Sequence, residues 1–305
     1  MEQDKNTPYC YNSLFDLHRM LGLPKPLHPL ISLINISNNI LDNASLPNSH
    51  TSVFYKISYK ENLSGKLKYG QSYYDFDEGG LLFVSPNQVT ANGENNGDHT
   101  GYTLIVHPDF LLSYPIAKSI KQYGFFSYSA NEALHLSSKE KKVIISIFKN
   151  IDDELQERID NFSQDIVISL IELLLSYSNR FYKRQFITRK AINNNVLQKL
   201  EELLDTHFQD KNLSAQGLPT VQYLSQQLNL SPSYLSDMLR SLTGQSTQQY
   251  IHNRLIETAK EKLSTTALSV SEIAYELGFE HSQSFSRLFK IKTNLSPIAF
   301  RRTFN

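Results

Sequence analysis

The sequence predicts an α+β protein in which a small β-barrel, a helical segment and an all-helical domain follow one another. Three observations support this division. Short strand-like runs occupy residues 1–136, and two long runs with helical periodicity occupy residues 137–188. Residues 189–305 contain a repeated pair of helices, at about 220–244 and 270–294. At about 100–200 residues per domain, the length of 305 residues suggests two domains.

The N-terminal part reads as a series of short strands. Clusters rich in Gly, Asn and Asp separate the strand-like runs, as at residues 92–97. Several short strands at this spacing favour a sandwich or a barrel. The runs are Leu30–Ile36, Val53–Tyr59, Leu81–Ser85 and Tyr102–His107. Their aromatic residues are candidates either for plain core or for the lining of a pocket, and these are Tyr55, Tyr59, Tyr69, Tyr73 and Phe83.

The apolar period changes to that of a helix after Ser137. Ser137-x-x-Glu140 predicts a capping box, which opens a run with one apolar face ending near Leu155. A second run, from Phe162 to Phe181, is apolar over a wider arc and therefore needs burial on more than one side. Packing against the chain's own barrel and pairing with a second copy both satisfy that need. We expect the polar stretch Arg189–Asn195 to be a linker.

The most informative feature is a self-similarity between Val221–Ser246 and Val270–Ser296. Leu224 matches Ile273, 49 residues further on, and Leu239 matches Phe289, 50 residues further on. The one-residue slip falls in a turn, where an insertion costs little. Each copy therefore predicts a helix, a tight turn and a second helix.

Turn and cap residues agree in the two copies. The turns carry Asn229 and Gly278, and the second helices end at Gly244 and Asn294. Gly and Asn are the residues that best tolerate the left-handed backbone needed there. Serines predict N-caps for four helices, at Ser231, Ser246, Ser269 and Ser296. The helix that connects the copies keeps one face apolar through Ile251, Leu255, Ala259 and Leu263.

The outward sides of the two second helices form candidate DNA-reading faces. Gln283 has the amide that pairs with adenine, Arg287 has the fork that pairs with guanine, and Asp237 has an acceptor for a cytosine amine. Arg240 and Lys290 lie a turn further along, where contacts with phosphates are expected. The full candidate set is Ser233, Tyr234, Ser236, Asp237 and Arg240 in the first copy and Ser282, Gln283, Ser286, Arg287 and Lys290 in the second.

The net charge of zero hides an uneven distribution. Residues 189–305 hold 13 Lys and Arg against 10 Asp and Glu, a net charge of +3 that the rest of the chain balances. The stretch His281–Asn305 has five basic residues and no acid. We therefore expect the second copy to supply most of the affinity for phosphates. The first copy, with Asp237, is expected to act as a selector.

These residues resemble the DNA-binding domain of the AraC/XylS family of bacterial transcription regulators. The resemblance runs from about Val221 to Arg302 and includes SEIAYELGF, SFSRLFK and SPIAFRR. It implies that one helix of each unit enters successive major grooves of double-stranded DNA, with the connecting helix fixing their separation. The implied function is sequence-specific transcription regulation, and the chain is expected not to be an enzyme.

A weaker resemblance extends upstream. GGLLFVSPNQ at Gly79–Gln88 is similar to a strand and turn of the cupin-like barrel that many members use to sense an effector. The resemblance implies a small-molecule effector for the barrel and a homodimer formed through the helices from Ser137 to Arg184. RNA polymerase is a further partner that this family suggests.

The composition argues against several other classes. No apolar run is long enough for a membrane span, and the N-terminus lacks the apolar core of a secretory signal. The single Cys10 excludes an internal disulfide framework and a CxxC metal site, so we expect a cytoplasmic protein. His99 and His107 lie eight residues apart without an H-x-H pattern, so neither a metal nor another cofactor is expected.

Two other interpretations stay open. A cupin-type enzyme with a helical appendage predicts clustered metal ligands within residues 30–110. A protein-binding adaptor built on helical pairs predicts no salt-dependent affinity for DNA.

Overall fold

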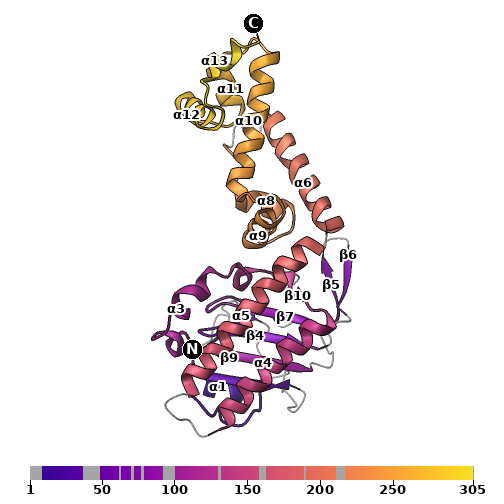
Figure 1. Cartoon of the computed structure of the whole chain (residues 1–305), viewed down its shortest axis with the longest axis vertical. Coiled ribbons are helices and arrows are strands. Elements are labelled where there is room, and N and C mark those ends of the chain that lie inside the picture. Colours follow the sequence, from indigo (N-terminus) through magenta and orange to yellow (C-terminus); the bar gives the residue numbers. More distant parts are fainter. Residues whose placement is uncertain are drawn as a thin grey trace, which may run out of the picture. The chain divides into compact units, whose positions relative to one another are not determined.

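The computed structural model describes residues 9–36, 49–61, 63–69, 72–76, 79–91, 100–129, 132–157, 163–188, 190–210 and 217–304. The chain divides into two compact units, Met1–Gln185 and Phe186–Asn305. Strands and helices share the first unit, whereas the second contains helices throughout its described ranges (Figure 1). The prediction of an α+β chain with an all-helical C-terminal domain is therefore confirmed.

An antiparallel sheet of five strands forms the centre of the first unit, in the order β10-β7-β4-β9-β2. The four strands expected from the sequence correspond to β2, β4, β7 and β9, and each boundary is within two residues of its prediction. The bounds are β2 (Ile31–Asn35), β4 (Tyr55–Lys60), β7 (Gly80–Val84), β9 (Gly101–Val106) and β10 (Leu134–His135).

A three-stranded sheet in the order β1-β3-β8 and a hairpin of β5 and β6 complete the described strands. Closure into a barrel requires the two edge strands of a sheet to pair with each other. Within the described ranges, β2 pairs with β9 alone and β10 with β7 alone, so the five-stranded sheet is open and the expected closed barrel is wrong for these strands. The remaining bounds are β1 (Tyr9–Tyr11), β3 (Ser49–Ser52), β5 (Leu63–Tyr69), β6 (Ser72–Phe76) and β8 (Thr90–Ala91).

The central sheet has two unlike faces because side chains alternate along a strand. Tyr55, Ile57 and Tyr59 of β4 are buried on one face. Aromatic rings extend this face, including Phe83 of β7, whose centroid lies 4.4 Å from that of Phe125. Tyr55, Tyr59 and Phe83 therefore belong to the core, while the side chains of Tyr69 and Tyr73 lie outside the described part of the chain.

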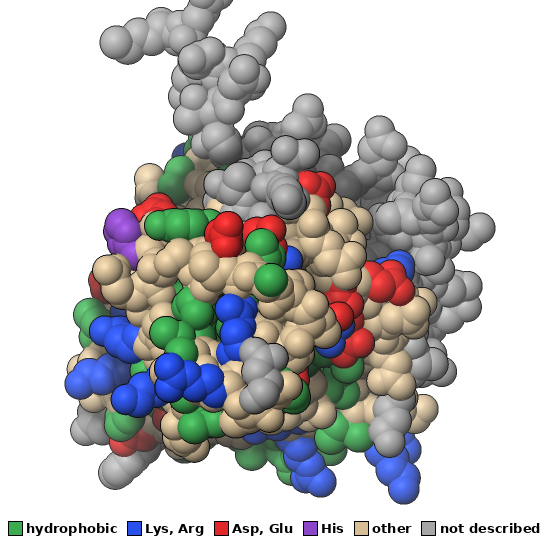
Figure 2. Space-filling model, turned by 90° about the horizontal axis from the view of Figure 1, so that it is seen from above, with side chains coloured by type: hydrophobic (Ala, Val, Ile, Leu, Met, Phe, Trp, Pro, Cys, Tyr) green, Lys and Arg blue, Asp and Glu red, His purple; other side chains and the backbone are tan. Residues whose placement is uncertain are grey.

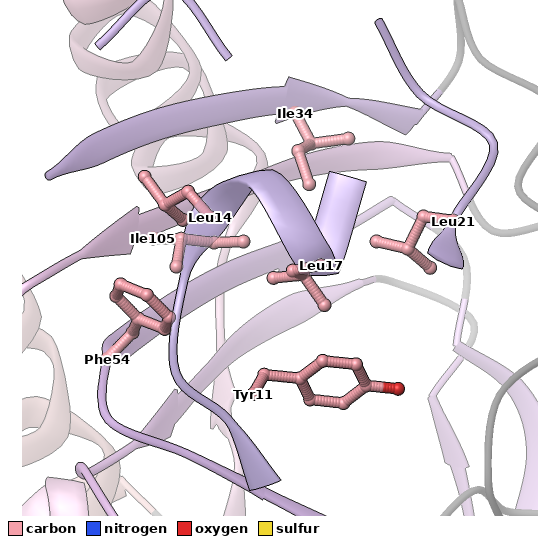
Figure 3. Packing of buried hydrophobic residues seen from close by; sticks show 7 residues of the cluster. All are labelled: Tyr11, Leu14, Leu17, Leu21, Ile34, Phe54 and Ile105. Carbon is pink, nitrogen blue, oxygen red and sulfur yellow. The ribbon is translucent and has the colours of Figure 1, made fainter. Parts of the chain in front are cut away.

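Helix α1 (Leu14–Met20) packs on the opposite face at one end of the sheet. Figure 3 shows Leu14 and Leu17 of this helix against Ile34 and Ile105 of β2 and β9. Short helical turns follow β9 before the chain reaches β10. They are α2 (Pro108–Leu111), α3 (Ile116–Ser119), η3 (Ile120–Gln122) and η4 (Gly124–Ser127).

Two long helices, α4 (Ser138–Gln156) and α5 (Ser163–Thr188), follow the strands. The predicted capping box of Ser137 and Glu140 is confirmed. One side of α5 is buried, whereas Ile166 and Leu173 on another side are each 44% exposed. Packing of α5 against its own unit is therefore confirmed for one face, and pairing with a second copy stays a prediction for the other.

Within its described ranges, the C-terminal unit contains α6 (Lys190–Gln209) and six further helices. The linker expected at Arg189–Asn195 is wrong for residues 190–195, which form the first turns of α6, and Arg189 lies outside the described residues. Asn193 is buried and donates to the Phe186 carbonyl oxygen (2.6 Å), so its polar side chain has a partner inside the unit. The other helices are α8 (Val221–Gln227), α9 (Pro232–Thr243), α10 (Thr247–Thr265), α11 (Val270–Glu276), α12 (Ser282–Thr293) and α13 (Pro297–Arg301).

Every turn and cap predicted for the repeat is confirmed. Asn229 and Gly278 have φ angles of 55° and 87°, and Gly244 and Asn294 have φ angles of 72° and 60°. All four predicted N-cap serines accept a hydrogen bond from a backbone N–H in the first turn of their helix. None of the helices in the described ranges combines the length and hydropathy that a bilayer span requires.

Candidate nucleic-acid interface

Two helical pairs, α8 with α9 and α11 with α12, form the candidate interface (Figure 1). In each pair the second helix turns its large apolar residues inward. Leu235 and Leu239 of α9 are fully buried, as are Phe285 and Phe289 of α12. This packing fixes which side of each second helix is left for a ligand.

The outward side of α12 is exposed and cationic. Gln283, Arg287 and Lys290 follow one another at spacings of four and three residues, so they share one face of the helix. Ser282 and Ser286 lie half-buried beside that face. The exposure predicted for the long polar side chains of the second copy is therefore confirmed.

No acidic residue occurs in α12, which carries Arg287, Lys290 and Lys292. Figure 2 shows Lys and Arg side chains gathered on the side of the C-terminal face where α12 lies. Lys292 extends this group, with its ammonium donating to Asn253 Oδ1 of α10 (3.0 Å). Duplex DNA carries a dense row of phosphates, so such a surface attracts it.

The outward side of α9 differs from this pattern. Arg240 is exposed and Ser233 is half-buried. Asp237 is half-buried and lies 4.0 Å from the Arg240 guanidinium, one turn further along. The opposite charges of this pair offset each other, which leaves the outward side of α9 far less cationic than that of α12.

Two of the predicted DNA-reading residues on α9, Tyr234 and Ser236, make contacts inside the C-terminal unit. Tyr234 is only 8% exposed, and its ring meets that of Phe186 with centroids 5.1 Å apart, so the prediction that it faces outward is wrong. Its position next to Leu235 puts it on a second buried side of α9, which the repeat pattern does not reveal. The Ser236 hydroxyl donates to the Pro232 carbonyl oxygen (2.8 Å) and accepts from Thr247 Oγ1 (3.1 Å).

Helix α10 holds the two pairs together from the inside. Its Arg254 forms a two-pronged salt bridge with Asp205 of α6, with Nε and Nη2 donating over 2.7 Å and 2.5 Å. Tyr250 donates to Glu201 of α6 over 2.7 Å, and burial together with this bond raises the pKa of its phenol. These partners are 49 residues apart in the sequence, so no local pattern predicts them.

Arg301 shows that not every basic residue of the C-terminal stretch is available to bind phosphate. Its guanidinium donates to the backbone carbonyl oxygens of Leu263 (3.1 Å) and Leu268 (2.6 Å), where it ties the last helix to α10. It is therefore a structural residue within the basic C-terminal stretch.

Sequence reasoning missed two exposed polar residues at the start of α12, His281 and Ser284, although both lie within a turn of Gln283.

The N-terminal unit has no candidate metal centre within its described ranges, where no three His, Cys, Asp or Glu side chains come together. The Nδ1 atom of His107 accepts from the Asp109 backbone N–H (3.2 Å) and so caps α2. His99 lies outside the described residues.

These features define a class of protein: a DNA-binding protein with two helix-turn-helix motifs, α8 with α9 and α11 with α12. A family model described as a helix-turn-helix domain matches residues 224–303. The chain is a DNA-binding transcription regulator, and residues 224–303 form its helix-turn-helix domain, which is of the AraC type.

Relatives extend over most of the chain or over its C-terminal part. An uncharacterised HTH-type transcriptional regulator of Bacillus subtilis, YfiF, is 26% identical over 259 residues, which cover 84% of this chain and 79% of the relative. The arabinose operon regulatory protein of Escherichia coli is 30% identical over 140 residues, 46% of this chain and 45% of that protein. Among solved structures, the C-terminal domain of AraT, a response regulator from Geobacillus stearothermophilus, is 30% identical over 35% of this chain and 84% of its own, with a TM-score of 0.31.

Proposed function

We propose that this regulator reads DNA with α9 and α12 in successive major grooves on one face of the duplex. The connecting helix α10 supports this spacing. It has 19 residues, which make a helix about 28 Å long, close to the roughly 34 Å that separate successive major grooves. The salt bridge of Arg254 with Asp205 gives α10 a fixed place among its neighbours.

In this proposal α12 supplies most of the affinity. The observation that carries it is the row of Gln283, Arg287 and Lys290 on the exposed face of a helix without acids. Gln283 and Arg287, in the first half of α12, are assigned to base edges, and Lys290 to phosphate. Ser282 and Ser286 have hydroxyls for either kind of contact.

Helix α9 acts as the selector. Asp237 accepts hydrogen bonds from an exposed base amine and repels nearby phosphates, so it favours particular bases over general affinity. Ser233 lies beside it, and Arg240 is left for phosphate. Tyr234 and Ser236 have the different task of positioning α9, because their contacts lie inside the unit.

The N-terminal unit is the regulatory part of the proposed protein and binds a small-molecule effector. A second copy of the chain pairs along α5. Ile166, Leu170, Leu173 and Tyr177 recur at intervals of four, three and four residues, the spacing of a coiled-coil seam. The exposure of Ile166 and Leu173 supports this pairing, and RNA polymerase is the partner through which bound protein would change transcription.

The test is the affinity of the full chain for a duplex selected from a random library, measured by fluorescence anisotropy at 50 and 200 mM salt. We expect the affinity to fall at least a hundredfold between these concentrations, because several phosphate contacts release counterions. Arg287→Ala should lower affinity about tenfold or more, and Lys118→Ala on the exposed surface of the first unit should not. Binding without a salt slope would overturn the proposal.

A further inference from the structure

Strand β4 presents two lysines on one face of the central sheet. Lys56, Ser58 and Lys60 alternate with the buried Tyr55, Ile57 and Tyr59 and so point to the opposite face. The Ser58 hydroxyl lies 3.0 Å from the hydroxyl of Thr103 on β9, and the strand register places these two residues side by side. Two ammonium groups therefore flank a pair of hydroxyls.

The space beside Lys60 is free of neighbouring side chains on the two adjacent strands. Lys60 pairs with Gly80 of β7 on one side and with Gly101 of β9 on the other. A Cβ at Gly80 would lie against the Leu134 carbonyl oxygen, and a Cβ at Gly101 would lie against the Tyr59 carbonyl oxygen, so both positions require glycine. Neither neighbouring strand therefore places a side chain beside the stem of Lys60.

Neither ammonium group has a carboxylate partner among the residues that the structure describes. In the part of the chain that the structure describes, no ion pair involves Lys56 or Lys60. Both side chains are only partly exposed. Burial lowers the pKa of Lys56 to about 8 and also lowers the pKa of Lys60. A partly buried charge without a counter-charge weakens the folded state.

A buried phenol adjoins the Lys56 end of this face. Tyr11 is fully buried, and its hydroxyl has no hydrogen-bond partner among the described residues. Figure 3 shows that hydroxyl directed away from Phe54. The Tyr11 ring lies 5.4 Å from that of His50, whose pKa falls to about 4 because of burial and the positive charge of Lys56. Buried hydroxyls in proteins usually have a partner.

We propose that this face binds a small dianion between Lys56 and Lys60, with the hydroxyls of Ser58, Thr103 and Tyr11 as further donors. The Cα atoms of the two lysines are about 13 Å apart, four residues along a strand. Their side chains are long enough to grip a short dicarboxylate at both ends or to converge on one phosphate. The inference deepens the proposed regulatory role of the N-terminal unit by naming the chemical class of its effector, and it rests on that role.

The experiment is thermal unfolding of the full chain with succinate, inorganic phosphate or glucose 6-phosphate, with neutral glucose as the control. We expect succinate or the two phosphates to raise the melting temperature, and glucose to leave it unchanged, because a ligand that binds the folded state alone stabilises it. Response to succinate alone identifies a dicarboxylate site, and response to the phosphates alone identifies a phosphate site. No shift with any of these dianions overturns the proposal.

Variants locate the site. Lys56→Met and Lys60→Met should each weaken the dianion response at least tenfold while melting, without ligand, at or above the wild-type temperature, because each removes an uncompensated charge. Lys118→Met is the surface control and should keep the response. Arg287→Ala should also keep the response. This variant loses phosphate binding at α12, so a response that remains in it comes from another site. A dianion response that survives both β4 substitutions, or that disappears in Arg287→Ala, contradicts the proposed dianion site. A failure of the chain to bind DNA counts only against the proposed function.

Discussion

The ring of Tyr234 meets the ring of Phe186 edge to face, with centroids 5.1 Å apart and an interplanar angle of 69°. This contact joins α9 to the first residue of the C-terminal unit. A residue that looks like a DNA contact in the repeat pattern is therefore part of the core that orients the helix.

Tyr234→Phe should keep DNA affinity within about twofold, because the ring and not the hydroxyl makes this contact. Tyr234→Ala should destabilise the protein by about 3 kcal/mol through the lost aromatic packing. Urea unfolding measures the second effect and anisotropy the first. A loss of affinity of tenfold or more in Tyr234→Phe, with stability unchanged, would show that the hydroxyl contacts DNA after all.

Arg287→Ala and Asp237→Ala should affect DNA binding in different ways. Loss of Arg287 removes a cation from the face that supplies affinity, at an expected cost of about 1–3 kcal/mol on the best site. Loss of Asp237 should weaken discrimination among site variants and leave affinity for the poorer sites equal or higher. Titrations of both variants against a panel of single-base site changes compare the effects. Equal weakening by Asp237→Ala at every site contradicts the assignment.

Gly244→Ala should lower the free energy of unfolding by about 1 kcal/mol, because Gly244 has a φ of 72° and an L-residue is strained there. No atom lies within 4 Å of the added Cβ, so the cost comes from the backbone alone. Asn294→Gly is the matched change at the equivalent helix end and should be neutral or stabilising. Urea midpoints of the two variants that shift equally in the same direction would refute this explanation.

Leu173→Glu should convert a dimer to a monomer, since it places a charge in the apolar row on α5. Sedimentation velocity of the full chain measures the change. Lys183→Glu, on the exposed side of the same helix away from Leu173, is the control and should leave the assembly intact. A dimer that persists in Leu173→Glu moves the interface elsewhere.

Acidification should destabilise the N-terminal unit in part through His50. Its folded-state pKa of about 4 lies below the usual 6.5, chiefly because of burial and then because of the charge of Lys56. As the pH falls, the unfolded chain therefore takes up a proton on His50 before the folded chain does. The contribution of neutral His50 to the stability of the folded unit is complete above pH 6.5 and is lost as the pH falls toward 4. Urea midpoints at pH 7 and pH 5 should differ more for the wild type than for His50→Gln. An equal or larger difference in the variant contradicts this assignment.

Local features of the fold were predictable from sequence because they depend on neighbouring residues. The left-handed turns at Asn229 and Gly278 and the caps of the repeat follow from residue type and spacing alone. The four main strands follow from alternation, which marks one buried face.

Features that depend on distant residues were not predictable in this way. The buried place of Tyr234 depends on Phe186, 48 positions earlier in the chain. The anchoring of α10 depends on Arg254 meeting Asp205, and the open sheet depends on which strands pair at its edges. The polar start of α6 suggested a linker, because the carbonyl oxygen that pairs with Asn193 cannot be seen in the sequence.

Recognition of two grooves is tested by selecting binding sites for the full chain from a random duplex library. We predict two enriched segments with centres about 10 base pairs apart, one for each helix-turn-helix unit. Insertion of 5 base pairs between them should lower affinity at least tenfold, because it moves one segment to the other side of the duplex. A single enriched segment, or affinity that does not change with this insertion, would contradict recognition by α9 and α12 together.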